Sequence, residues 1–133
     1  MAYKVLLIED NADCRELFAM MVRHLGFQVL QADDGELGVQ KALSEKPDLI
    51  FMDVGMPNMD GIEATYSLRE NSLTRGTPIV ICTAWMGAKY RDAALKSGAQ
   101  EVVLKPISYA DLQGILLRYL PAPTESPHVY VEH

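Results

Sequence analysis

Each of four apolar runs in this 133-residue sequence is followed at once by a side chain that carries a charge or a hydroxyl group. In chain order these side chains are Glu9 and Asp10, Asp53, Thr83, and Lys105. Taken singly, each is an ordinary turn residue, helix start or surface charge. Three carboxylates, one hydroxyl and one ammonium form a functional site only if the fold brings them together.

The chemistry of such a site would be that of a hard cation and a phosphoryl group. Carboxylates that lie close together repel and need a cation, and oxygen-only ligands select Mg²⁺ or Mn²⁺. No Cys/His cluster is present in the sequence, which disfavours zinc. Asp53, placed beside a cation and Lys105, is equipped to attack a phosphoryl group, because both positive charges stabilise the phosphoryl oxygens. The Thr83 hydroxyl can donate one further hydrogen bond.

The elements that must position these residues alternate along the chain. Strands are expected at residues 5–8, 27–32, 49–53, 78–83 and 101–104, with a helical pattern after each. This order predicts a doubly wound α/β domain, (βα)5, with a parallel sheet covered by helices on both faces. Because right-handed crossovers place all strand carboxyl ends at one edge, the candidate residues should share one cleft.

Local signals refine the expected helices. Asn11 or Asp13 is the candidate cap of the first helix, and Asp34 of the second. Ser108 to Asp111 has the pattern of a capping box before the last helix. Gly38 lies inside the second helix and predicts close packing there. The apolar face of the first helix is expected to consist of Cys14, Leu17, Phe18, Met21 and Leu25.

Composition narrows the class of protein. The chain is 49% hydrophobic and 23% charged with a formal net charge of −6, so an acidic globular domain without direct nucleic-acid contacts is expected. No apolar run is long enough to cross a membrane, and the first one is too short for a signal peptide. We therefore expect a cytoplasmic protein with no membrane partner. Cys14 and Cys82 are expected to be reduced core residues.

These motifs together resemble the receiver (phosphoacceptor) domain of two-component response regulators over about residues 3–120. The matching residues are Glu9-Asp10, Asp53, Met56-Pro57, Met59-Asp60-Gly61, Thr83-Ala84 and Lys105-Pro106. The resemblance implies a flavodoxin-like fold with strand order 2-1-3-4-5. It also implies a signalling domain, not an enzyme in the usual sense, that changes conformation when it is phosphorylated.

The resemblance assigns a role to each matching position. Asp53 would accept the phosphoryl group from a histidine kinase or a phosphotransfer protein. Mg²⁺, or Mn²⁺, would be held by Glu9, Asp10, Asp53 and the backbone carbonyl of Gly55. Thr83 and Lys105 would contact the phosphoryl group, and the Lys105–Pro106 peptide bond would be cis.

Three positions depart from the family pattern. Gly55 has no side chain to reach over the phosphoryl group. Trp85 is either an aromatic packed on the sheet edge or a lid that limits water access to the phosphoryl group, in which case Trp85→Ala would speed its loss. Val102 stands where receivers often have an aromatic ring that moves on activation. Switching then involves loop and helix movement alone, or another aromatic such as Tyr90 or Trp85.

The resemblance also implies partners. A downstream protein would bind the face formed by the fourth helix, the fifth strand and the fifth helix, with candidate contacts at Tyr90, Arg91, Lys96, Gln113 and Arg118. The domain would be a monomer or a phosphorylation-dependent dimer. Residues 1–120 are expected to form the domain and residues 121–133 a flexible, proline-rich tail, part of it a linker or a tag remnant.

Other classes of function make different demands on the sequence. A degenerate receiver acting only as a scaffold would not need the acidic, hydroxyl and lysine positions, all of which are present. A flavodoxin-like cofactor binder would need a phosphate-cradling first loop, whereas residues 9–13 are Glu-Asp-Asn-Ala-Asp. An aspartyl-phosphate phosphatase would be expected to carry an Asp-x-Asp pair after the first strand, and Asp10 is followed by Asn11 and Ala12.

Overall fold

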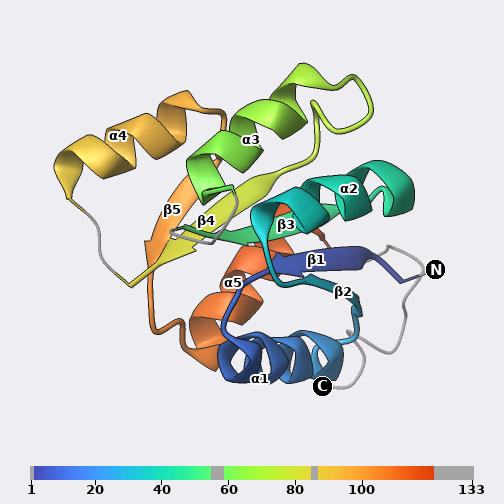
Figure 1. Ribbon diagram of the computed structural model, residues 1–133. Coiled ribbons are helices and arrows are strands. Elements are labelled where there is room, and N and C mark those ends of the chain that lie inside the picture. Colours follow the sequence, from blue (N-terminus) through green and yellow to red (C-terminus); the bar gives the residue numbers. More distant parts are fainter. Residues whose placement is uncertain (1, 55–58, 85–86, 122–133) are drawn as a thin grey trace.

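The computed structural model describes residues 2–54, 59–84 and 87–121, which form a parallel sheet of five strands. The strands are β1 (Lys4–Ile8), β2 (Gln28–Ala32), β3 (Leu49–Asp53), β4 (Ile79–Thr83) and β5 (Glu101–Leu104). Their order in the sheet is β2-β1-β3-β4-β5, and every neighbouring pair is parallel. The expected α/β class and strand order are therefore confirmed (Figure 1).

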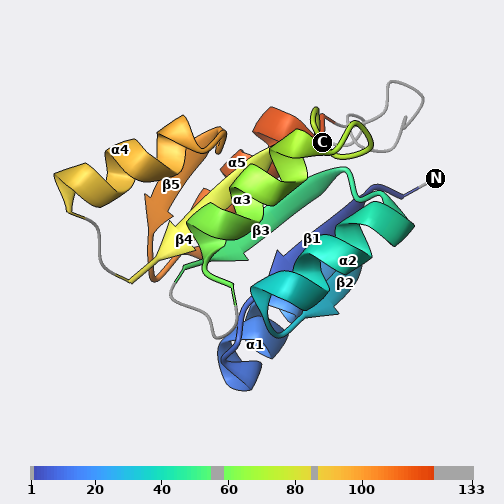
Figure 2. The ribbon, with the colours of Figure 1, turned by 45° about the horizontal axis from the view of Figure 1, so that its top comes forward.

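A helix follows each strand and returns the chain to the start of the next. The helices are α1 (Ala12–His24), α2 (Gly35–Glu45), α3 (Gly61–Glu70), α4 (Ala88–Lys96) and α5 (Tyr109–Tyr119). Figures 1 and 2 show α1 and α5 on one face of the sheet and α2, α3 and α4 on the other. None of the described helices is long and apolar enough to span a bilayer.

The core consists of two apolar layers, one on each face of the sheet. Alternate strand residues point to opposite faces, so Leu6, Ile50 and Ile81 pack under α2, α3 and α4. Leu7, Phe51 and Val80 pack under α1 and α5. The central strands β1 and β3 are covered on both faces, which explains their unbroken apolar runs.

Side-chain caps begin four of the five described helices. Asn11, Asp34, Asp60 and Ser108 each accept a hydrogen bond from the backbone N–H three residues further on. Of the two candidates for the first helix, Asn11 is the cap and Asp13 lies inside the first turn. These caps fix where each helix leaves the edge that carries the strand ends.

Two glycines bring helices close to the strands. A Cβ atom at Gly38 would lie 2.4 Å from Cδ1 of Ile8, which confirms the close packing expected in α2. A Cβ atom at Gly61 would lie 2.3 Å from the carbonyl oxygen of Asp53. The start of α3 is therefore packed directly against the backbone of the residue that ends β3.

The predicted apolar face of α1 is wrong in part. Ala19 and Val22 are the fully buried residues of this helix, while Leu17 is 60% exposed. Cys14 is also exposed, so only Cys82 of the two free cysteines is a core residue. Phe18, Met21 and Leu25 of the predicted face are partly buried and pack against the apolar layer under α1 and α5, as expected. Cys14 and Leu17 are the exceptions, and they border a cleft that is described below.

Candidate functional site

The three predicted carboxylates meet at the carboxyl edge of the sheet. Glu9 and Asp10 follow β1, and Asp53 ends β3, the strand next to β1. Each side chain offers a carboxylate oxygen, and these oxygens all lie within 4.8 Å of one another. Glu9 is buried, Asp53 is half-buried and Asp10 is exposed. The cluster is therefore open to solvent on the side of Asp10.

Lys105 supplies the positive charge of the site. It follows β5 directly, and its ammonium forms ion pairs with the carboxylates of Glu9 and Asp53, the second at 3.3 Å between Nζ and Oδ1. Its backbone N–H donates to the carbonyl oxygen of Thr83 at 2.7 Å. The Lys105–Pro106 peptide bond is cis, as expected.

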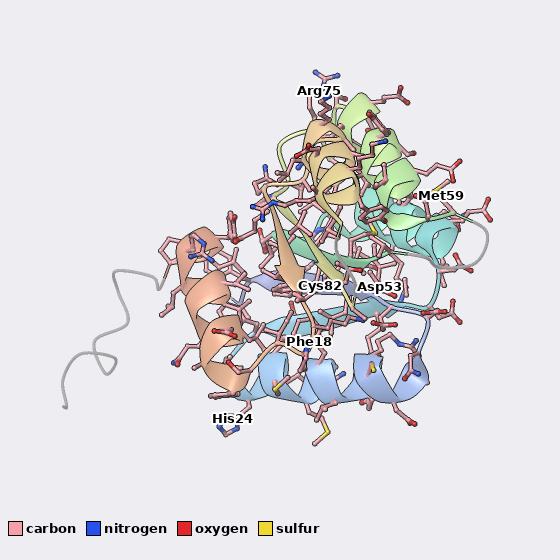
Figure 3. The ribbon with its side chains drawn as sticks, turned by 90° about the vertical axis from the view of Figure 1, so that its left-hand side faces the viewer. Phe18, His24, Asp53, Met59, Arg75 and Cys82 are labelled. Carbon is pink, nitrogen blue, oxygen red and sulfur yellow. The ribbon has the colours of Figure 1, made fainter. Side chains whose placement is uncertain are left out.

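Thr83 is buried at the end of β4, between the strands that carry Asp53 and Lys105. In the register of the sheet Asp53 pairs with Cys82 and Thr83 pairs with Leu104. Thr83 is thus one residue further toward the carboxyl edge than the partner of Asp53. Figure 3 shows Asp53 and Cys82 close together on their strands.

Burial and nearby charges shift the pKa values of Asp53 and Glu9 in opposite directions. Burial raises the pKa of Asp53 to about 6; the nearby Glu9 carboxylate adds to this rise, and the Lys105 ammonium opposes it. Burial acts on Glu9 in the same direction, but hydrogen bonds from Lys105 and the Asn11 N–H outweigh it, so the pKa of Glu9 is lowered. Burial would lower the pKa of Lys105, whereas its hydrogen bond to Glu9 and its ion pair with Asp53 raise it. Without further positive charge, the carboxylate of Asp53 is therefore less stable as an anion than that of Glu9.

The donor set fits a hard divalent cation. Three carboxylates face one ammonium, and no cysteine or histidine belongs to the clusters of potential metal ligands found among the described residues. Gly55, the fourth predicted ligand, lies outside the described residues, as does Trp85.

A cleft of about 350 Å³ adjoins the site between α1 and the loop after β5. Its walls are mainly apolar and include Leu17, Phe18, Met21, Phe51 and Ile107, while Glu9, Asp53 and Lys105 border it. Phe18 extends from α1 toward the sheet (Figure 3), and its ring meets that of Phe51 edge-on at 4.9 Å between centroids. The exposed side chains of α1 that were expected in the core thus line an opening next to Asp53.

The residues that were predicted to take part in switching differ in their exposure. Val102 is buried in the layer under α4. Tyr90 is half-buried on α4; burial raises the pKa of its hydroxyl, and the carboxylates of Asp60 and Asp53 raise it further. Of the other predicted partner contacts, Arg91, Lys96, Gln113 and Arg118 are exposed, and Arg118 forms an ion pair with Glu101 at 3.1 Å.

Arg15 was not among the predicted site residues, yet it contacts the backbone of the cluster. Its Nη1 donates to the carbonyl oxygen of Glu9 at 2.8 Å. The sequence offers only a weak signal for this contact, namely a basic residue one turn into the helix that follows an acidic loop.

Comparison with known proteins agrees with this geometry. Residues 5–117 match the family described as the response regulator receiver domain. The phosphate regulon transcriptional regulatory protein PhoB of Escherichia coli is 32% identical over 129 residues, which cover 94% of this chain and 56% of PhoB. The transcriptional regulatory protein PdtaR of Mycobacterium tuberculosis is 37% identical over 110 residues, which cover 82% of this chain and 52% of PdtaR.

Solved structures give the same result. The receiver domain of the sensor histidine kinase PA1611 from Pseudomonas aeruginosa, with a magnesium ion coordinated in its active site cleft, is 33% identical. It superposes with a TM-score of 0.85 over 92% of this chain and 100% of that one. The chemotaxis protein CheY4 of Vibrio cholerae is 29% identical, with a TM-score of 0.85 over 90% of this chain and all of CheY4.

This chain spans only about half the length of PhoB and PdtaR. The family match, in contrast, covers most of the chain, and the sheet order and the acidic cluster agree with it. The chain belongs to the response regulator receiver domain family.

Proposed function

We propose that Asp53 is the phosphoacceptor of this receiver domain. A carboxylate oxygen of Asp53 forms a bond to the phosphorus of a phosphohistidine on a histidine kinase or a phosphotransfer protein. The phosphorus–nitrogen bond breaks, and its electron pair stays on the imidazole of the donor. The product is an acyl phosphate on Asp53. The observation that carries the proposal is the position of Asp53 beside two further carboxylates and within 3.3 Å of the Lys105 ammonium.

The surrounding residues have complementary roles in this proposal. Glu9, Asp10 and Asp53, with the carbonyl of Gly55, hold Mg²⁺, and Mn²⁺ can replace it because the ligands are oxygens. A bound divalent ion supplies positive charge opposite the phosphoryl oxygens. In this proposal Lys105 moves its ion pair from Asp53 to the phosphoryl group, and Thr83 donates a hydrogen bond from the end of β4.

Phosphorylation then regulates a protein partner or an output domain. We assign this function to residues 1–120 and the downstream contact to the face formed by α4, β5 and α5. PhoB and PdtaR, both transcriptional regulatory proteins, support a regulatory role. The proposed domain acts in the cytoplasm, as a monomer or as a dimer formed on phosphorylation.

The test is phosphorylation by acetyl phosphate. Intact-mass spectrometry should show one added phosphoryl group in Mg²⁺ and none in excess chelator. Borohydride reduction of the acyl phosphate should convert residue 53, and no other, to homoserine. A wild-type protein that takes up no phosphoryl group in saturating Mg²⁺ would favour a phosphorylation-independent scaffold instead.

The pKa of Asp53 leads to a pH-dependent affinity for Mg²⁺. With a pKa of about 6, Asp53 is mostly protonated at pH 5 and mostly ionised at pH 7. A proton and a metal ion compete for the same oxygen, so the Kd for Mg²⁺ should be about tenfold higher at pH 5 than at pH 7. An NMR titration of the backbone amides at both pH values measures this. Asp53→Asn should show little of the difference; an equally strong pH dependence in that variant would exclude Asp53 as its source.

A further inference from the structure

We infer that Arg15 is a positioning residue for the metal site, and this inference rests on the proposed function. Arg15 lies in the first turns of α1 and is half-buried. Its Nη1 donates to the carbonyl oxygen of Glu9 at 2.8 Å, and its Nε donates to the side-chain oxygen Oε1 of Gln31 at 3.0 Å. One guanidinium thus joins the start of α1, the end of β1 and the edge strand β2.

The carbonyl that Arg15 holds is the one that determines where Asp10 points. It belongs to the peptide group between Glu9 and Asp10, and a peptide group is planar. The backbone hydrogen bonds between β1 and β2 end at the N–H of Glu9, which donates to the carbonyl oxygen of Ala32 at 3.1 Å. The next carbonyl is beyond the strand pairing, and Arg15 provides its partner. Without Arg15 this peptide group can rotate, and the exposed Asp10 carboxylate turns with it.

The rest of Glu9 is already held by other partners. Its Oε2 accepts from the Asn11 N–H at 3.0 Å, and its Oε1 pairs with Lys105. Glu9 is only 8% exposed. Arg15 binds the remaining acceptor of Glu9, its main-chain carbonyl oxygen. Glu9 and Asp10 are thereby held in one arrangement at the metal site. Removing a hydrogen bond that orients a metal-binding residue commonly weakens metal binding by about 10- to 100-fold.

Charge and position predict opposite results for Arg15, which makes the inference testable. If Arg15 acted only through its charge, its removal would make the acidic cluster more negative and Mg²⁺ would bind more tightly. If it positions the peptide group, its removal should weaken Mg²⁺ binding although the cluster becomes more negative. We expect a rise in the Kd of about tenfold for Arg15→Ala.

The experiment measures Mg²⁺ affinity by an NMR titration of the folded protein, together with the melting temperature. Arg15→Lys keeps the charge but cannot contact Glu9 and Gln31 in the same planar way, so only partial rescue is expected. Gln31→Ala removes the second anchor without any change in charge but leaves the hydrogen bond from Arg15 to Glu9, so its Kd should rise only about threefold, less than for Arg15→Ala. Arg23→Ala removes a positive charge from the exposed end of the same helix, where Arg23 pairs with Glu16 at 3.7 Å, and it should leave the Kd unchanged.

The outcomes separate this inference from the proposed function. A wild-type protein that does not bind Mg²⁺ at millimolar concentrations would overturn the metal site, and the role of Arg15 with it. Normal binding by the wild type with equal or tighter binding by Arg15→Ala would overturn the role of Arg15 alone. A merely structural role would lower the melting temperature of Arg15→Ala without changing the Kd of the folded protein, and that result would also overturn the inference.

Discussion

Replacing Asp53 with asparagine is expected to abolish phosphorylation and, in the absence of Mg²⁺, to make the domain more stable. The loss should be complete, because an amide is not a nucleophile toward phosphorus. The other carboxylate beside Lys105, that of Glu9, is buried and already bound by the Lys105 ammonium and the Asn11 N–H. The gain in stability arises from the same feature that makes the site functional. Three carboxylates are gathered there with one ammonium between Glu9 and Asp53.

The sign of the stability change follows from the pKa. Burial raises the pKa of Asp53 from 3.8 to about 6, so the folded protein holds this proton more tightly than the unfolded chain does. Its contribution to stability is fully present below about pH 4 and is lost as the pH rises through about 6. A shift of this size corresponds to at most about 3 kcal/mol at neutral pH. This figure already includes the ion pair with Lys105, and the partial exposure of the site to solvent reduces it, so a net gain of about 1–2 kcal/mol is expected for the neutral asparagine variant.

Urea unfolding in chelator at pH 4 and pH 7.5 measures this change. The variant should be more stable than the wild type at pH 7.5, and the two should be similar at pH 4. Asp92→Asn, on the exposed side of α4, is the matched control and should change stability by less than about 0.5 kcal/mol at either pH. A less stable Asp53→Asn protein at pH 7.5 would show that the ion pair with Lys105 outweighs the burial of the charge.

Replacing Arg69 with alanine is expected to destabilise the domain by about 2–4 kcal/mol. Arg69 is a half-buried residue of α3 whose guanidinium donates to backbone carbonyls of two loops. Nη1 reaches the carbonyl oxygens of Thr74, Arg75 and Thr77, and both Nε and Nη2 reach that of Gly98, at 3.0 and 2.9 Å. No carboxylate lies within ion-pair distance of Arg69 in the described part of the chain. Its loss would leave several carbonyls without partners at the ends of α3 and α4.

Thermal or urea unfolding of Arg69→Ala measures the effect. Arg75→Ala is the control, because Arg75 is exposed and its side chain makes one long contact with the described residues, from its Nε to the carbonyl oxygen of Arg69 at 3.4 Å. It should change stability by less than about 0.5 kcal/mol. Arg69→Lys should recover little, since a single ammonium cannot serve acceptors on two loops. Equal effects of Arg69→Ala and Arg75→Ala would contradict a specific role of Arg69 in joining the loops.

Much of the fold could be predicted from local patterns in the sequence. The run that ends on Asp53 is apolar at every position because β3 is covered on both faces, and this is visible without a structure. The caps Asp34 and Ser108 are likewise local, since each bonds a backbone N–H only three residues away. Once the βα order was recognised, the handedness of the crossovers was enough to predict that Glu9, Asp53 and Lys105 would meet.

The orientation of α1 could not be predicted in the same way. Its larger apolar residues recur at helical spacing, but the side that faces the sheet depends on how closely the helix approaches it. Ala19 and Val22 allow a close approach, and Leu17 is left exposed beside the cleft. Helical periodicity restricts the choice to neighbouring faces, and packing against β1 and β3 selects one of them.

The sequence by itself determined the order of the elements, the edge at which the acids and the lysine gather, and the class of chemistry that they allow. Only the tertiary structure decided the contacts of Arg15 and Arg69 and the proton balance between Glu9 and Asp53. The physical reason is distance along the chain. Arg15 meets Gln31, Arg69 meets Gly98 and Lys105 meets Glu9 across 16, 29 and 96 residues. Such contacts, and the burial that raises the pKa of Asp53, exist only after the sheet and its helices have come together.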